Sequence, residues 1–166
     1  MGLVIVLVDA LFSGYDGVPD PAGWVLVLAG LLPLRDTLRS PVGLVGTAVV
    51  CLVVSVATYP PQVADRLDDT AGWALSLPQL GFGFLLCTAL APHAGALASR
   101  FAVLRWLFVV LALAPVVVLG GGVDVLREPL AFVVVAVEVY LVYLLFRCSG
   151  VVPAGKGPGG EPDPAA

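Results

Sequence analysis

The sequence predicts an all-α protein, a polytopic transmembrane helix bundle. Three observations predict it: 60% of the 166 residues are hydrophobic, only 12% are charged, and the mean hydropathy is +1.05. A soluble domain of this size needs more charged side chains to cover its surface. Hydrocarbon is therefore the solvent that fits most of the chain.

Six apolar segments follow one another, separated by short polar connectors. The last four are long enough to cross about 30 Å of hydrocarbon as helices. The first two are shorter, so they form either two short crossings or one re-entrant hairpin. Two crossings are favoured because a hairpin places Asp16 and Asp20 at depth, where an unpaired carboxylate is costly. The segments are residues 3–15, 22–34, 42–59, 72–91, 101–119 and 130–146.

Valine is abundant in these segments, and valine favours strands in water. Inside lipid this preference is overridden, because every backbone group must be hydrogen-bonded within the protein. Strands of a membrane barrel alternate apolar and polar residues. The runs 108–114 and 133–137 are apolar at every position, so they predict helices.

The segments form one predicted membrane domain, residues 1–149. Residues 150–166 are mostly Gly, Pro and Ala, with Lys156, Glu161 and Asp163 as their charged residues. This composition cannot build a core, so we expect a disordered cytoplasmic tail.

Basic residues orient the predicted bundle, because short connectors rich in Lys and Arg stay in the cytoplasm. Of the eight bases, Arg66 and Arg127 lie on one side, each beside acidic residues. The other six lie on the opposite side: Arg35, Arg39, Arg100, Arg105, Arg147 and Lys156. We therefore expect a multi-pass protein of the cell (inner) membrane with both termini in the cytoplasm.

Three tryptophans lie near predicted segment ends, Trp24 and Trp73 on the outer side and Trp106 on the inner side. Amphipathic aromatic rings prefer the boundary between lipid and water. We expect all three rings at that boundary.

Glu138 lies near the middle of the last segment, among apolar residues. A charged carboxylate there is costly, so Glu138 must face the bundle interior, pair with a base, or be protonated. One interpretation is a proton or cation site. The other is a neutral acid that makes one interhelical hydrogen bond, worth about 1 kcal/mol. Tyr140 and Tyr143 do not share its helix face, so no relay along one stripe is predicted.

Two further charged residues lie within or at the edge of apolar segments. Asp9 is a second candidate for an intramembrane polar site, or it bonds to the following turn or an adjacent helix. Arg105 begins the fifth segment, where it extends to the cytoplasmic surface as an anchor. A bond between Arg105 and Glu138 is also conceivable from the sequence.

The connector between the first two segments holds two acids, Asp16 and Asp20, among turn-forming residues. Asp20 followed by Pro21 is the order expected of a helix N-cap and the first helical residue, which predicts a capped turn. The alternative is an outer-loop site for a cation or a lipid headgroup, although two carboxylates alone are a weak metal signal.

Helix breakers and small residues mark further positions. Pro78 and Pro115 interrupt the fourth and fifth segments. One interpretation is that each proline bends its helix or frees a carbonyl group for a ligand. The other is that they have no special role, because proline is common in membrane helices. Gly43 and Gly46 in the third segment predict close helix packing.

The remaining residues indicate no cofactor and no metal. The single histidine, His93, excludes two-histidine haem ligation, and the three cysteines lack metal-ligand spacing, so we interpret them as packing residues. A net charge of −4 argues against a nucleic-acid partner. We find no catalytic constellation and do not expect an enzyme.

The stretch from Asp9 to Arg35 contains Gly-Tyr-Asp-x-x-Pro-Asp-Pro-x-Gly-Trp followed by an apolar run. It resembles the N-terminal hairpin of uncharacterised small multi-pass bacterial membrane proteins. The resemblance covers about a sixth of the chain, and it implies a bacterial inner-membrane setting and no particular chemistry.

Two functions remain open. The first is a non-enzymatic membrane protein that packs with, scaffolds or regulates a partner, either another membrane protein or a second copy, within the lipid bilayer. The alternative is a small proton- or cation-coupled carrier or channel that uses Glu138, together with Asp9.

Overall fold

The computed structural model describes residues 20–34, 41–60, 62, 68–121 and 124–149. Within these ranges the regular structure is helical, as the sequence predicts. The helices are α2 (Asp20–Leu31), α3 (Pro41–Thr58), α5 (Asp69–Leu90), α6 (Ala98–Gly121) and α7 (Arg127–Ser149). Short 3₁₀ turns are η1 (Leu32–Leu34), η2 (Ala91–His93), η3 (Gly95–Leu97) and η4 (Asp124–Leu126).

Four described helical stretches are long and apolar enough to span a membrane, which confirms the four long segments. They are Pro41–Thr58, Thr70–His93, Gly95–Val118 and Pro129–Cys148. The second short segment forms a shorter apolar helix, Pro21–Leu31. The first segment, residues 3–15, lies outside the described residues, and so do the choice between two crossings and a hairpin and the tail 150–166.

Proline marks the starts of three helices. Pro21, Pro41 and Pro129 each lie in the first turn of α2, α3 and α7. The first N–H groups of a helix have no partner within it, so the missing proline N–H is tolerated there. The start of α5 uses a side chain instead, because the Asp68 carboxylate accepts a hydrogen bond of 2.7 Å from the Ala71 N–H.

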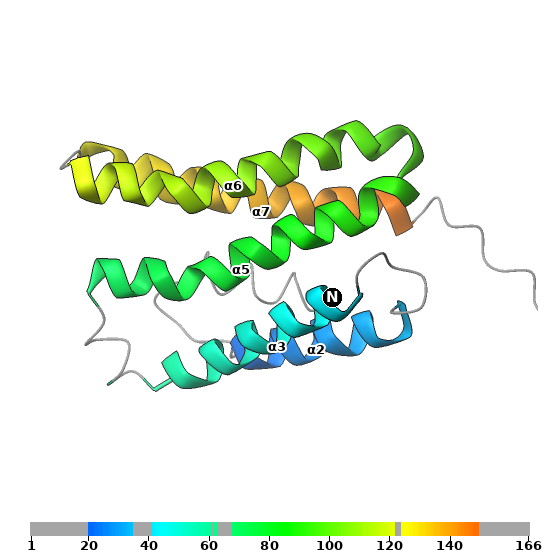
Figure 1. The fold of residues 1–166 in the computed structure, drawn as a ribbon, viewed down its shortest axis with the longest axis horizontal. Coiled ribbons are helices and arrows are strands. Elements are labelled where there is room, and N and C mark those ends of the chain that lie inside the picture. The colour runs from blue at the N-terminus through cyan, green and yellow to red at the C-terminus, as the bar shows by residue number, and fades with distance from the viewer. Residues whose placement is uncertain (1–19, 35–40, 61, 63–67, 122–123, 150–166) are drawn as a thin grey trace, which may run out of the picture.

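The helices alternate in direction, and α5 lies between two pairs (Figure 1). On one side it packs against α3, which in turn packs against α2. On the other side it packs against α6, which is followed by α7. One end of the bundle therefore carries the connection from α5 to α6 and the last turn of α7, while the other end carries the connection from α6 to α7.

The core consists of one stripe from each helix, at spacings of three and four residues. In α6 the stripe is Phe101, Leu104, Phe108, Leu111 and Val118. In α3 it is Leu44, Ala48, Cys51 and Ser55. This spacing keeps a single face of each helix toward its neighbours. The opposite faces leave valine, leucine and phenylalanine exposed, as a lipid environment requires.

Close packing occurs at Gly83 of α5, not at the glycines that the sequence suggested. A Cβ atom placed on Gly83 would lie 2.6 Å from Cζ of Phe108 on α6. Gly43 and Gly46 have open space around them, so the prediction of close packing there is wrong for the described part of the chain. The Phe108 ring fills the space that a side chain at position 83 would occupy.

Trp24 is also placed differently from the expectation. Its ring is only 3% exposed and meets the Phe82 ring edge to face, with centroids 5.2 Å apart. The predicted boundary position is wrong for Trp24, because α2 turns this ring inward onto α5. Trp106, by contrast, is 59% exposed.

Pro78 and Pro115 lie inside continuous helices, α5 and α6. A proline removes one hydrogen bond from the helix ladder and displaces the preceding turn. In α6, the turn before Pro115 receives a bond from a neighbouring helix, since Trp73 Nε1 donates to the Ala112 carbonyl at 3.2 Å. An indole N–H from α5 thus contacts the backbone of α6 beside its proline.

Candidate functional site

Among the side chains that the structure describes, Glu138 is the charged one that is buried inside the bundle. It lies midway along α7, eleven residues from each end at Arg127 and Ser149, and its side chain is only 9% exposed. Oε1 of the carboxyl group accepts a hydrogen bond of 2.8 Å from Nε2 of Gln79 on α5. The carboxyl group therefore faces the neighbouring helices and not lipid.

Gln79 is the partner that sequence reasoning missed. It follows Pro78 and is separated from Glu138 by 59 positions, so no local spacing connects the two. Their predicted depth in the membrane could have indicated the pair, because each residue lies near the middle of its own predicted segment. A buried polar group in lipid needs a partner at the same depth, and Gln79 was the polar residue available on α5 at that level.

Other hydroxyl groups near the core bond to their own helices. Thr47, Thr58 and Thr88 donate to carbonyl oxygens four residues earlier, at 2.8, 3.0 and 2.8 Å. Such bonds satisfy a hydroxyl without water. Ser55 differs, since its side chain is 7% exposed and its Oγ has no hydrogen-bond partner within the described residues.

The remaining sequence candidates are not brought together with Glu138 in the described part of the chain. Asp9 and Asp16 lie outside the described residues. Helix α2 begins at Asp20, with Pro21 next, close to the predicted start, but the Asp20 side chain also lies outside what the structure describes.

Tyr140 and Tyr143 stack on each other with centroids 6.2 Å apart, and both are exposed, away from the face of Glu138. Arg105, the conceivable partner for Glu138, lies with its guanidinium carbon 5.6 Å from the centroid of its neighbour Trp106. A hydrogen bond from Gln79 joins Glu138 to α5.

Metal ligands do not gather among the described residues, where no group of three or more His, Cys, Asp or Glu side chains occurs. Cys51 and Cys87 are buried as free thiols, and Cys148 is half-buried. The two buried cysteines lie in the apolar core and pack there as small apolar side chains.

Comparisons with protein families, with curated proteins and with solved structures found no match. The chemistry must therefore be read from the residues themselves. A carboxyl group held between two helices by an amide has two uses. It holds one helix in register against another, or it binds a proton or a cation when water reaches it.

Proposed function

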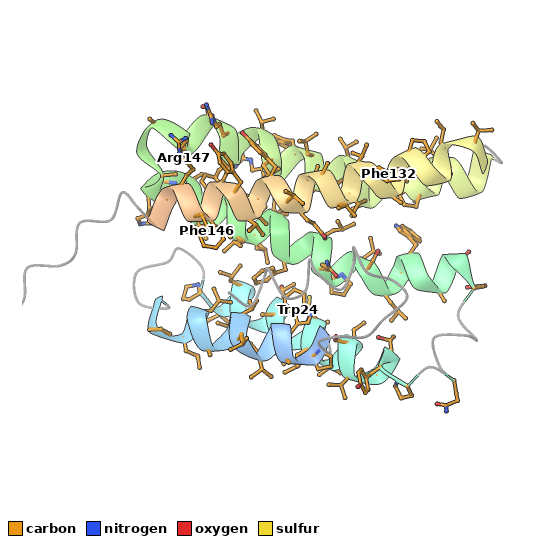
Figure 2. All side chains as sticks on the ribbon, turned by 180° about the vertical axis from the view of Figure 1, so that it is seen from behind. Trp24, Phe132, Phe146 and Arg147 are labelled. Carbon is orange, nitrogen blue, oxygen red and sulfur yellow. The ribbon has the colours of Figure 1, made fainter. Side chains whose placement is uncertain are left out.

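We propose that this chain is a non-enzymatic membrane protein that packs with, scaffolds or regulates a partner inside the bilayer. The observation that carries the proposal is the outer face of α7. Four aromatic side chains are exposed along this helix: Phe132, Tyr140, Tyr143 and Phe146. Figure 2 shows Phe132 near one end of α7 and Phe146 near the other.

Aromatic rings offer a helix partner more contact area than aliphatic side chains do. Tyrosine hydroxyls also form hydrogen bonds, which another membrane helix can provide and hydrocarbon cannot, although the Tyr143 hydroxyl already accepts one from Arg147. The partner that fits is a transmembrane helix, either of a different protein or of a second copy. The polar bond between Glu138 and Gln79 supports this function, because it holds α7 in register while its outer face stays available.

The experiment is site-specific photo-crosslinking in intact cells. A photoreactive phenylalanine analogue replaces Phe132 on α7, which is 76% exposed, and a matched control replaces Val53 on α3, also exposed. We expect a discrete adduct from position 132 and none from position 53. Equal labelling at both positions, or no adduct at either, contradicts a partner on α7.

A second candidate function is a small proton- or cation-coupled carrier or channel, favoured by the burial of Glu138 at mid-helix. The test is flux in liposomes that contain the purified protein, followed with a pH-sensitive dye inside the vesicles. A carrier predicts solute-dependent flux that Glu138→Gln abolishes. A packing protein predicts no flux from either form, with both forms folded.

We further propose that the chain lies in a bacterial inner membrane with both termini in the cytoplasm. Support comes from Arg100 and Arg105 near the start of α6 and Arg147 near the end of α7, which lie toward the same end of the bundle. Short basic connectors stay cytoplasmic. A reporter that is fluorescent only in the cytoplasm, fused after Ala166, should fluoresce, and its silence would contradict this orientation.

A further inference from the structure

Helix α2 begins in the middle of the bundle and not at one of its ends. Its first residue, Asp20, lies four residues before Trp24, whose ring meets the Phe82 ring of α5 with centroids 5.2 Å apart. Because α2 and α5 run in the same direction, Asp20 lies about 6 Å before that contact along the helix axis. This is close to the level of Gln79, which comes three residues before Phe82. Figure 1 shows the same start of α2, about midway along the bundle.

Two polar side chains meet at this level. Gln79 of α5 donates a hydrogen bond of 2.8 Å to Glu138, and Glu138 lies at the midpoint of α7. Gln79 and Phe82 are three residues apart, so their side chains lie next to each other on α5. The face of α5 that meets Glu138 therefore continues into the face that meets α2.

Ser55 of α3 lies at the same depth. Leu31, at the end of α2, and Leu44, in the first turn of α3, are buried in one core cluster. Asp20 lies eleven residues before Leu31, and Ser55 lies equally far after Leu44. Since α2 and α3 run in opposite directions, Asp20 and Ser55 both lie about 16 Å from the two leucines, at one level. Ser55 belongs to the buried stripe of α3, so its side chain faces the neighbouring helices and not lipid.

The Ser55 hydroxyl has no hydrogen-bond partner within the described residues, although its side chain is only 7% exposed. Thr58 on the same helix and Thr88 on α5 instead donate to carbonyl oxygens of their own helices, at 3.0 and 2.8 Å. A buried hydroxyl without a partner destabilises a protein, so each such group calls for an explanation. A ligand at the level of Ser55 would supply the missing partner.

The side chains of Ser55, Gln79 and Glu138 thus form a midplane layer, contributed by α3, α5 and α7. Each offers an oxygen: a hydroxyl, the Oε1 end of an amide whose Nε2 is already used, and a carboxyl group. Oxygen ligands of this kind suit hard cations. The described part of the chain holds no group of three or more His, Cys, Asp or Glu side chains, so the layer matches a monovalent ion better than a multivalent one.

The start of α2 makes the midplane layer more polar. The first N–H groups of a helix have no acceptor within it, and hydrocarbon offers none, so a helix end at this depth needs polar surroundings. In membrane transporters, helices that break off near the midplane accompany ion sites. Because α2 begins with an acidic residue, Asp20, it has the residue type that offsets the positive end of a helix dipole.

We propose that Ser55, Gln79 and Glu138 bind a small monovalent cation, Na⁺ or K⁺, at the mid-depth of the bundle where α2 begins. The carboxylate supplies the opposite charge, and the hydroxyl and amide oxygens replace water around the ion. The site goes beyond the proposed packing function and does not depend on it, because an ion can bind here with or without a partner helix on α7. Binding also requires no flux, so the site is tested separately from the carrier.

The experiment measures equilibrium binding of radioactive Na⁺, and separately of Rb⁺ in place of K⁺, to the full chain purified in detergent. Unlabelled Na⁺, K⁺ and choline serve as competitors at constant ionic strength. The variants are Ser55→Ala and Glu138→Gln. Thr88→Val is the matched control, because it also removes one shielded hydroxyl but one that bonds to its own helix at the Phe84 carbonyl.

Wild-type protein should bind at least one of the two ions, and choline should not displace it because choline is too large. Ser55→Ala should weaken binding about tenfold, as expected for the loss of one contact with a charged group. Glu138→Gln should abolish it, since the opposite charge is lost. Thr88→Val should change it by less than about twofold. No displaceable binding of either ion, or wild-type affinity in Ser55→Ala, overturns the site.

Thermal unfolding covers the case in which Glu138→Gln does not fold, because Ser55→Ala removes a single oxygen atom. The Tm of the wild type should rise when the chloride salt of the bound ion replaces choline chloride, since a ligand that binds only the folded state stabilises it. Ser55→Ala should lose most of that rise, yet be at least as stable as the wild type in choline, where its hydroxyl is unpaired. An equal rise in both forms means that Ser55 only packs, and overturns the site.

Discussion

The central helix α5 meets α6 and α7 in two different ways. Against α6 the contact is apolar and close, with Gly83 leaving room for the Phe108 ring. Against α7 the backbones approach at few points, and a hydrogen bond from Gln79 to Glu138 joins the helices at mid-depth. Shape therefore specifies the first contact, while one polar pair specifies the second. Lipid supplies no hydrophobic force that favours either, so each needs its own source of specificity.

Of the changes that test these two contacts, Gly83→Ala should destabilise the protein most. The added Cβ would lie within 3 Å of three Phe108 ring atoms, so α5 and α6 must move apart or the buried ring must turn. We expect a loss of about 1–3 kcal/mol, the usual cost of overpacking. Unfolding in mixed detergent and SDS micelles measures it. Gly81→Ala is the control, because open space surrounds Gly81 and alanine favours the helix. Equal destabilisation by both changes would mean that the ring contact does not matter.

The second prediction tests whether the α5–α6 contact also depends on the turn that connects the two helices. Gly95 has φ of +51°, in the left-handed region that other residues adopt at a cost. Gly95→Ala should destabilise the protein by about 1–2 kcal/mol. The same titration measures the loss. Gly120→Ala, at a glycine with open space and no positive φ, serves as the comparison. A neutral result at position 95 would show that the turn tolerates strain or rearranges.

The α5–α7 contact is tested by a double-mutant cycle on Gln79 and Glu138. Gln79→Ala leaves the buried Glu138 without this partner, and Glu138→Ala leaves the half-buried Gln79 without it. The coupling energy should be about 1 kcal/mol, within the range of interhelical hydrogen bonds in membranes. The same cycle on Gln79 and Tyr140, which is exposed on another face of α7, should give no coupling. Additive changes at 79 and 138 would remove the polar pair as the source of specificity.

The smallest expected effect concerns Trp73. Trp73→Phe removes the indole donor to the Ala112 carbonyl and keeps most of the apolar area. We expect a loss of about 0.5 kcal/mol, since membrane hydrogen bonds average little more. Trp106→Phe is the control, on an exposed ring. If Trp73→Phe loses several times more stability than Trp106→Phe, the turn before Pro115 depends on this bond.

Sequence alone predicted the four long helices because length and hydropathy are sufficient for a membrane span. It did not predict which faces meet. Gly43, Gly46 and Gly83 look equivalent in the sequence, yet only at Gly83 does a ring from another helix fill the space. Trp24 fitted a boundary position by its place in the segment, but in the structure its ring is buried and meets Phe82 of α5. Such outcomes depend on the rotation of each helix, which composition does not encode.

The candidate site shows the same division. The cost of a carboxylate in lipid predicted that Glu138 faces the interior, pairs with a base or is protonated, and it lies buried against α5. The identity of Gln79 required the relative heights of α5 and α7, which no local pattern gives. Arg105 was expected to anchor the chain at the surface, and the buried Nε atom became visible only with α6 packed in place.

Gln79 is an amide, and an amide offers both a donor and an acceptor. In the structure its Nε2 donates to Oε1 of Glu138, an arrangement that suits an ionised carboxylate. After a half-turn of its terminal amide, the Gln79 Oε1 can instead accept from the protonated acid. A lysine in its place would favour one charge state of Glu138 only. The choice of glutamine thus makes the attachment of α7 tolerant of acidity, so the helix can keep its register whether or not a proton resides on Glu138.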